Sequence, residues 1–178
     1  MSNREQISAA FEILKASFYD GGKLLLCGNG GSAADCEHIV GELMKGMNKK
    51  RSRFKMNPIQ GALPAISLCS HTGLITAIAN DIGADWIFAQ QVYGYGRSVD
   101  VLLAISTSGK STNVINAIRM ASHKDMHSIG LTGPRIKDFE NICDVVISVP
   151  GKTAMEIQEG HIKVYHELCT RLEEEFFP

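Results

Sequence analysis

The chain has 178 residues, of which 44% are hydrophobic and 21% charged, a composition that is typical of an ordinary globular protein and excludes a disordered or fibrous one. Lys and Arg total 18 against 19 Asp and Glu, and the net charge of -1 argues against nucleic acid as a partner. No segment approaches the ~20 continuous apolar residues of a membrane span, and the first residues lack an apolar signal core, so we expect no membrane partner and a cytoplasmic location.

Helical patterns alternate with short apolar strands along the chain. In chain order, the pattern predicts a helix over 4–20, a strand over 23–27, a helix over 32–45, a strand over 65–68, helices over 73–80 and 85–94, a strand over 99–105, a helix over 111–123, strands over 127–132 and 145–149, and a helix over 153–175. Strands connected by helices are typical of a parallel sheet covered on both faces. We therefore predict one α/β domain over residues 1–178, a three-layer sandwich around a five-stranded, mostly parallel sheet of the flavodoxin type.

Residues 45–62 interrupt this alternation. The segment has no clear helical or strand period and contains six basic side chains, Lys45, Lys49, Lys50, Arg51, Arg53 and Lys55. We interpret it as a solvated surface loop, and a lid over a substrate is the less favoured alternative.

The turn after the third predicted strand contains hydroxyl residues at four of six positions. Ser106, Thr107, Ser108 and Ser111 lie where the next helix exposes unpaired N–H groups and the positive end of its dipole. One hydroxyl is explained by helix capping, but four exceed that need. The turn therefore predicts a phosphate-binding cradle, with capping as the alternative.

The turn after the first strand, from Gly28 to Ala33, has the spacing G-x-G-x-x-A, a weak dinucleotide signature. A nicotinamide-binding protein would need an acidic residue roughly twenty residues later, where this chain has Lys49, Lys50 and Arg51. The dinucleotide interpretation is thus disfavoured, while a tight glycine turn that brings Ser32 close to a ligand remains.

Two helices carry further candidates. His38 and Glu42 are four residues apart on one helix face, on the polar side with Asp35, so a solvated face is the simpler interpretation and a catalytic pair would need a cover. In the last helix, His161 falls within the apolar stripe and is expected to be a satisfied core histidine. Gln158 and His166 lie two turns apart and could converge on one ligand, although a polar helix border is the alternative.

These pieces, in this order, resemble the sugar isomerase (SIS) domain, and within it the phosphoheptose isomerases, from about residue 6 to residue 175. The strongest matching segments are Cys27 to Ser32, His38 with Glu42, Asn80 with Asp81, Ile105 to Gly109, and Ile157 to His166. The phosphate loop is shared by the superfamily, whereas His38, Glu42, Gln158 and His166 together are more specific.

The resemblance implies an aldose–ketose isomerase that converts sedoheptulose 7-phosphate to D-glycero-D-manno-heptose 7-phosphate through an enediol. It assigns Glu42 as the base and His166 as the acid. It implies substrate or phosphate contacts at Asn29, Gly30, Gly31, Ser32, Asn80, Asp81, Ser106, Thr107, Ser108, Ser111 and Gln158. Some family members bind Zn²⁺, here implied at His38, Glu42, Gln158 and His166. The family also implies a homotetramer with sites at subunit interfaces.

The chain departs from the family pattern at several positions. His71-Thr72-Gly73 replaces a common Asp-Thr-Ser run, Gly46 replaces an Arg, and Met155 replaces an Asp. Lost contacts to sugar hydroxyls should alter specificity before they abolish proton transfer, so a different ketose phosphate is one alternative substrate. A second alternative is a non-catalytic SIS protein that senses a sugar phosphate or associates with a replication initiator.

Overall fold

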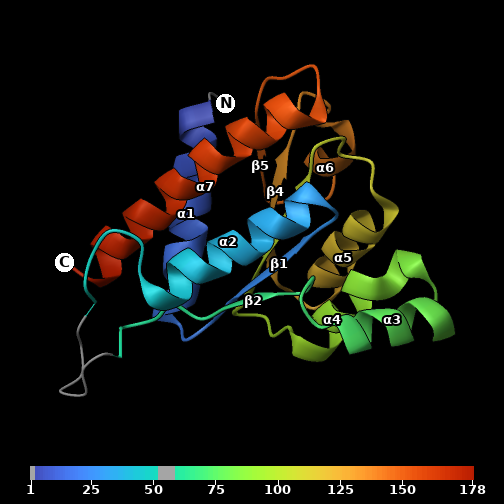
Figure 1. Cartoon of the computed structure of the whole chain (residues 1–178), viewed down its shortest axis with the longest axis horizontal. Helices are drawn as coiled ribbons and strands as arrows, with labels where there is room; N and C mark the ends of the chain where they lie inside the picture. Colours follow the sequence, from blue (N-terminus) through green and yellow to red (C-terminus); the bar gives the residue numbers. More distant parts are fainter. Residues whose placement is uncertain (1–2, 52–58) are drawn as a thin grey trace.

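The computed structural model describes residues 3–51 and 59–178 (Figure 1). In chain order its elements are α1 (Asn3–Tyr19), β1 (Leu24–Gly28), α2 (Gly31–Lys45), β2 (Ala65–Ser67), α3 (Thr72–Asp81), the 3-10 helix η1 (Ala84–Trp86), α4 (Ile87–Tyr95), β3 (Val101–Ser106), α5 (Thr112–His123), β4 (His127–Thr132), α6 (Lys137–Glu140), β5 (Val145–Ser148) and α7 (Ala154–Phe176). All the predicted strands and helices are present, with ends that shift by one or two residues.

The five strands form one parallel sheet in the order β2-β1-β3-β4-β5. This is the flavodoxin order, in which the direction of winding reverses between β1 and β3. Ligands of such sheets bind at the carboxyl ends of the strands beside this reversal, because the loops diverge there and leave a crevice. The turns that follow β1 and β3 are the two that the sequence singled out, so the fold brings them next to each other.

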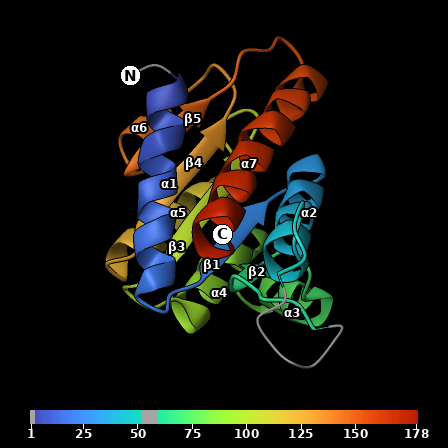
Figure 2. The same ribbon diagram turned by 90° about the vertical axis from the view of Figure 1, so that its left-hand side faces the viewer.

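Helices cover both faces of the sheet, and the predicted three-layer α/β class is confirmed. Figure 2 shows α1, α7 and α2 side by side over one face, with α7 in the middle. Alternate strand residues such as Leu24, Leu26 and Leu103 face these helices, while Leu25 and Leu102 face α4 and α5 on the other side. The central strands β1 and β3 are therefore buried on both faces, which explains why they are continuous apolar runs.

Three local features differ from the sequence prediction. The helix expected over 85–94 begins as η1 and continues as α4, and α6 is a single short turn that the pattern did not indicate. In the basic segment, Arg51 is only 2% exposed, so the prediction of a solvated loop is wrong for this residue. Arg53 and Lys55 lie outside the described residues. None of the helices in the described part of the chain is both long and apolar enough to cross a bilayer.

Candidate active site

The parallel helices α2 and α7 bring four polar side chains into one cluster. Nε2 of His38 lies 3.3 Å from Oε1 of Glu42, and Nδ1 of His38 lies 3.0 Å from the hydroxyl of Tyr165. The His166 ring packs edge-on against the His38 ring, with 5.1 Å between the ring centroids. The base and acid that the family implies therefore lie on either side of one histidine, within a single chain.

The cover that Glu42 requires comes from α7. The Glu42 side chain is 14% exposed, and that of His38 is 44% exposed, so the pair is partly shielded and still reachable by a small ligand. Asp35 is buried, and the expectation that it lies on a solvated face is wrong. Tyr165 donates a hydrogen bond of 3.3 Å to Oδ1 of Asp35 because α7 packs over this side of α2.

Burial changes the acidity of Asp35, the carboxyl group that Tyr165 bonds. Burial raises the pKa of Asp35, although the hydrogen bond from Tyr165 acts in the opposite direction. Its second oxygen, Oδ2, is buried and has no hydrogen-bond partner among the described residues. Because the Asp35 carboxylate has few hydrogen-bond donors, we expect the bond from Tyr165 to contribute strongly to stability.

The turn after β3 has the geometry of an anion cradle. Ser111 is the N-cap residue of α5, but its side chain makes no capping hydrogen bond. Its hydroxyl instead lies 3.1 Å from that of Ser106, and the Ser106 and Ser108 hydroxyls are 3.5 Å apart. The capping alternative therefore does not explain Ser111. In the first turn of α5 the Val114 N–H donates to Oδ1 of Asn113, and the N–H groups before it are available to a ligand or solvent.

The turn after β1 is equally free of side-chain capping. The N-cap of α2 is Gly30, whose φ of 58° lies in the left-handed region that glycine tolerates and that strains other residues. Ser32 is buried in the first turn of α2. The N–H groups of Ser32 and Ala33 donate to the backbone carbonyls of Asn29 and Gly30, both at 3.0 Å, so the first turn of α2 closes on its own backbone and not on a side-chain cap.

A pair of amides connects the two turns. Asn29 and Asn113 exchange two hydrogen bonds of 2.9 Å, each side-chain amide donating to the oxygen of the other. Asn29 is a predicted ligand contact, but Asn113 was missed, because nothing in the sequence indicates that the start of α5 reaches the turn after β1.

Gln158 reaches the N-terminus of α2. A Cβ atom built on Gly31 would lie 1.9 Å from Nε2 of Gln158, so the absence of a side chain at Gly31 makes room for this amide. Gln158 of α7 therefore lies next to the first residue of α2. That residue, Gly31, precedes His38 by seven residues.

Two other predictions have different outcomes. Asn80 and Asp81 end α3 and hydrogen-bond to each other at 2.7 Å, on a helix that packs against η1 and α4 rather than α2 or α7. His161 is fully buried as expected, but neither ring nitrogen has a hydrogen-bond partner of good geometry among the described residues. Burial lowers the pKa of His161 to about 4, although the nearby Thr132 backbone favours the charged form.

The predicted zinc ligands are assembled only in part. Within the described ranges, no group of three or more His, Cys, Asp or Glu side chains is spaced to hold a metal ion. His38 and Glu42 alone fit such a site. Since Tyr165 gives its proton to Asp35, Nδ1 of His38 must donate to Tyr165, and Nε2 of a neutral His38 then faces the Glu42 carboxylate as a second acceptor. Two acceptors at this distance require a proton or a cation between them.

Fold and site together define a class of α/β protein with a hydroxyl-rich turn at the carboxyl edge of the sheet, a kind of turn suited to anions, and with a carboxylate and two imidazoles on α2 and α7. Comparison with known proteins narrows this class. The family model described as SIS domain matches residues 1–133. A phosphoheptose isomerase of Burkholderia pseudomallei is 43% identical over 162 residues, covering 91% of this chain and 78% of that protein.

Solved structures agree with these relatives. The phosphoheptose isomerase of Neisseria gonorrhoeae superposes with a TM-score of 0.85 at 38% identity, covering 96% of this chain and 86% of its own. That of Francisella tularensis gives a TM-score of 0.81 at 34% identity, covering 93% and 84%. The chain therefore belongs to the SIS domain family and, within it, to the phosphoheptose isomerases, which are aldose–ketose isomerases. The family and enzyme class predicted from the sequence are confirmed.

Proposed function

We propose that this chain interconverts sedoheptulose 7-phosphate and D-glycero-D-manno-heptose 7-phosphate through an enediol, with Glu42 as the base and His166 as the acid. The observation that carries this assignment is the meeting of Glu42 and His166 around His38, where α2 and α7 run side by side. Proteins at 34% to 43% identity named phosphoheptose isomerase support the substrate.

The reaction needs two groups with different tasks. A carboxylate takes the proton from the carbon next to the carbonyl and returns it to the neighbouring carbon. An acid near the oxygens moves a proton between them as the carbonyl changes position. Glu42 is shielded enough to act as a base without full hydration, and an imidazole such as that of His166 can both donate and accept a proton through its ring nitrogens.

The phosphate is the handle that places the sugar. The hydroxyls of Ser106, Ser108 and Ser111 and the uncapped start of α5 are suited to a phosphate dianion. Thr107 and Ser108 also line a cavity of about 340 Å³ that includes Arg135 and Lys152, whose positive charges would attract the same group. A phosphate bound here leaves the carbonyl end of the sugar free to extend toward α2.

Zinc remains part of the proposal. His38 and Glu42 would hold the ion, with His166 beside them, and a bound Zn²⁺ would supply polarisation of the carbonyl oxygen. Gln158, which the family also implies, packs against Gly31 two helical turns from His38 and would have to move to join this set. The support is the acceptor–acceptor contact between Nε2 of His38 and Glu42 at 3.3 Å, which is also roughly the spacing of two neighbouring ligands in a tetrahedral zinc site. Metal analysis of purified protein, followed by chelation and re-addition of Zn²⁺, tests this assignment.

We also propose a homotetramer whose sites lie at subunit interfaces. Asn80 and Asp81 lie on a helix that packs away from α2 and α7 of the same chain, so a neighbouring subunit could bring them to a site. Close to them in the sequence, the large apolar side chains of Ile82 and Trp86 are 53% and 46% exposed, an exposure that favours an interaction surface. We expect Trp86→Arg to reduce the mass measured by light scattering, and an unchanged mass would contradict an interface at this position.

The decisive experiment compares Glu42→Gln and His166→Gln with the parent protein, using sedoheptulose 7-phosphate and detection of the aldose by NMR. We expect each variant to lose about a hundredfold or more of the activity, as is typical when a general acid or base is removed. Glu159→Gln, an exposed carboxylate on α7, is the matched control and should keep its activity. Binding without turnover in the parent protein would favour the non-catalytic alternative, and turnover only of another sugar would favour a different ketose phosphate.

A further inference from the structure

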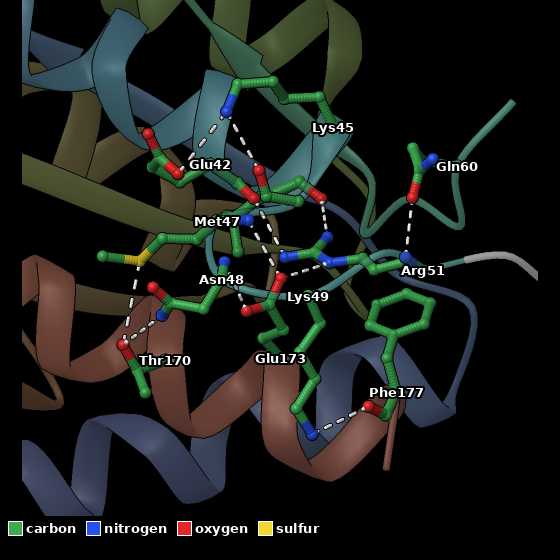
Figure 3. Close-up of polar contacts among 12 residues, drawn as sticks. Glu42, Lys45, Met47, Asn48, Lys49, Arg51, Gln60, Thr170, Glu173 and Phe177 are labelled. Atoms are coloured by element: carbon green, nitrogen blue, oxygen red, sulfur yellow. Dashed lines mark hydrogen bonds and ion pairs between the residues drawn. The ribbon is translucent and has the colours of Figure 1, made fainter. Parts of the chain in front are cut away.

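Arg51 lies at the centre of a buried polar cluster that joins the ends of the two catalytic helices (Figure 3). Its Nε donates to Oε1 of Glu173 at 2.8 Å, and the two side chains are 0% and 1% exposed. Its Nη1 and Nη2 donate to the backbone carbonyls of Leu43 and Glu42 at 2.5 and 2.9 Å. The Phe177 ring covers the guanidinium at 4.6 Å from ring centroid to Cζ.

Glu173 holds this arginine from α7. Besides the Arg51 bond, its carboxylate accepts hydrogen bonds from the backbone N–H groups of Met47 and Asn48, at 2.9 and 2.8 Å. Burial alone would raise the pKa of Glu173, but these donors outweigh burial and lower it. The carboxylate is therefore charged at neutral pH and saturated with donors.

The chain segment between α2 and Arg51 turns back, so that the Arg51 side chain reaches the last turn of α2. Gly46 has a φ of 95°, and a Cβ atom there would lie 3.3 Å from Nε of Arg51 and 3.1 Å from the Lys49 carbonyl oxygen. On the far side, the backbone of Arg51 is bound by the Gln60 side chain and the Gly61 N–H, each at 2.6 Å. Arg51 is thus fixed by both its backbone and its side chain.

These contacts act on the residues that carry the reaction. The carbonyls that Arg51 binds lie at the C-terminal end of α2, where helical carbonyls have no partner within the helix, and one of them belongs to Glu42 itself. Glu173 lies two turns beyond His166 on α7. The Arg51 guanidinium donates both to the end of α2 and to Glu173 of α7, and it therefore sets the separation and rotation of these two helices.

We propose that Arg51 is a positioning residue for the isomerase reaction, which holds the Glu42 carboxylate in register with His166 by tying the last turn of α2 to Glu173. This role rests on the proposed function of Glu42 as the base. A planar guanidinium is required, because it donates to the carboxylate and to two carbonyls at once, whereas the ammonium of lysine presents one point of charge.

The test measures kcat and KM for sedoheptulose 7-phosphate in Arg51→Lys and Glu173→Gln. We expect kcat to fall at least tenfold in Arg51→Lys, and less in Glu173→Gln, while KM changes by less than about threefold because the serine hydroxyls proposed to hold the phosphate lie in the turn after β3, away from the C-terminal end of α2. Substrate deuterated at the carbon that Glu42 deprotonates should show a larger isotope effect on kcat in Arg51→Lys than in the parent, since a misplaced base slows proton transfer.

A control variant in the core on the other face of the sheet separates a loss of stability from a misplacement of Glu42. Ile118→Val, buried between α5 and the sheet, lowers the melting temperature without touching α2 or α7, and should keep kcat and the isotope effect of the parent. An Arg51→Lys enzyme with parental kcat and isotope effect would overturn the proposal, as would a loss confined to KM. If Glu42→Gln is active, the proposed role of Glu42 as the base is wrong. If Glu42→Gln is inactive but Arg51→Lys keeps the parental kcat, only the positioning role of Arg51 is refuted.

Discussion

The hydroxyl of Tyr165 connects His38 of the catalytic cluster to the buried carboxylate of Asp35. It bonds to Nδ1 of His38 at 3.0 Å and to the buried carboxylate of Asp35 at 3.3 Å. A histidine that is bonded through one ring nitrogen keeps a fixed orientation and tautomer at the other. Tyr165 therefore determines which nitrogen of His38 faces Glu42.

Tyr165→Phe should lower both stability and activity. The variant leaves Asp35 with no donor, since its Oδ2 already has no partner among the described residues, and this costs about 1–3 kcal/mol for a buried polar group. Without its bond to Tyr165, the His38 ring is free to turn, so kcat falls. Urea unfolding and steady-state kinetics measure the two effects. Parental stability would show that solvent replaces the lost hydroxyl.

The sequence predicted from the family resemblance that Glu42 and His166 act together, and the structure places both side chains next to His38. The sequence could not predict that Asp35 and Arg51 are buried. The periodicity of α2 separates polar from apolar faces, but not a solvated polar face from one that α7 covers. Nothing in the local sequence of 45–62 distinguishes Arg51 from the other basic residues, because its burial depends on the tertiary position of Glu173.

At the scale of elements, the helices around the site begin in two different ways. α7 has a complete capping box, in which Thr153 accepts from the Glu156 N–H and the Glu156 carboxylate accepts from the Thr153 N–H. α2 and α5 begin without any side-chain cap. The Thr153 cap thus fixes the start of α7, whereas the start of α5, where the phosphate is proposed to bind, has no hydrogen bond from its N-cap side chain.

This contrast predicts opposite effects of two hydroxyl deletions. Thr153→Ala should cost about 0.5–2 kcal/mol of stability and leave KM near the parental value, because it removes a cap. Ser111→Ala should barely change stability, because its hydroxyl caps nothing, but should raise KM by removing a phosphate contact. Thermal unfolding and saturation kinetics distinguish them. A Ser111→Ala variant with a lower melting temperature and unchanged KM would return this residue to a purely structural role.

At the scale of the whole molecule, buried ionisable groups make the fold sensitive to acid. Lys23 is bonded to Asp100, which is fully buried at the start of β3; burial alone would raise the pKa of Asp100, but the Lys23 and Arg97 hydrogen bonds outweigh it and lower the pKa. Glu173 has a lowered pKa for similar reasons. Both carboxylates stabilise the fold fully above their unfolded pKa values, near 4, and this stability is lost as the pH falls through the folded values.

His161 should extend this acid sensitivity to milder pH. Its pKa is lowered from 6.5 to about 4 by burial, so between these values the unfolded chain binds a proton that the folded protein excludes. Unfolding is therefore favoured as the pH falls, by about 1.4 kcal/mol per pH unit for one proton. Urea unfolding from pH 7 to pH 4.5 should give this slope, and His161→Leu should remove most of it, while Asp100→Asn should change only the behaviour at lower pH. An unchanged slope in His161→Leu would assign the loss to other groups.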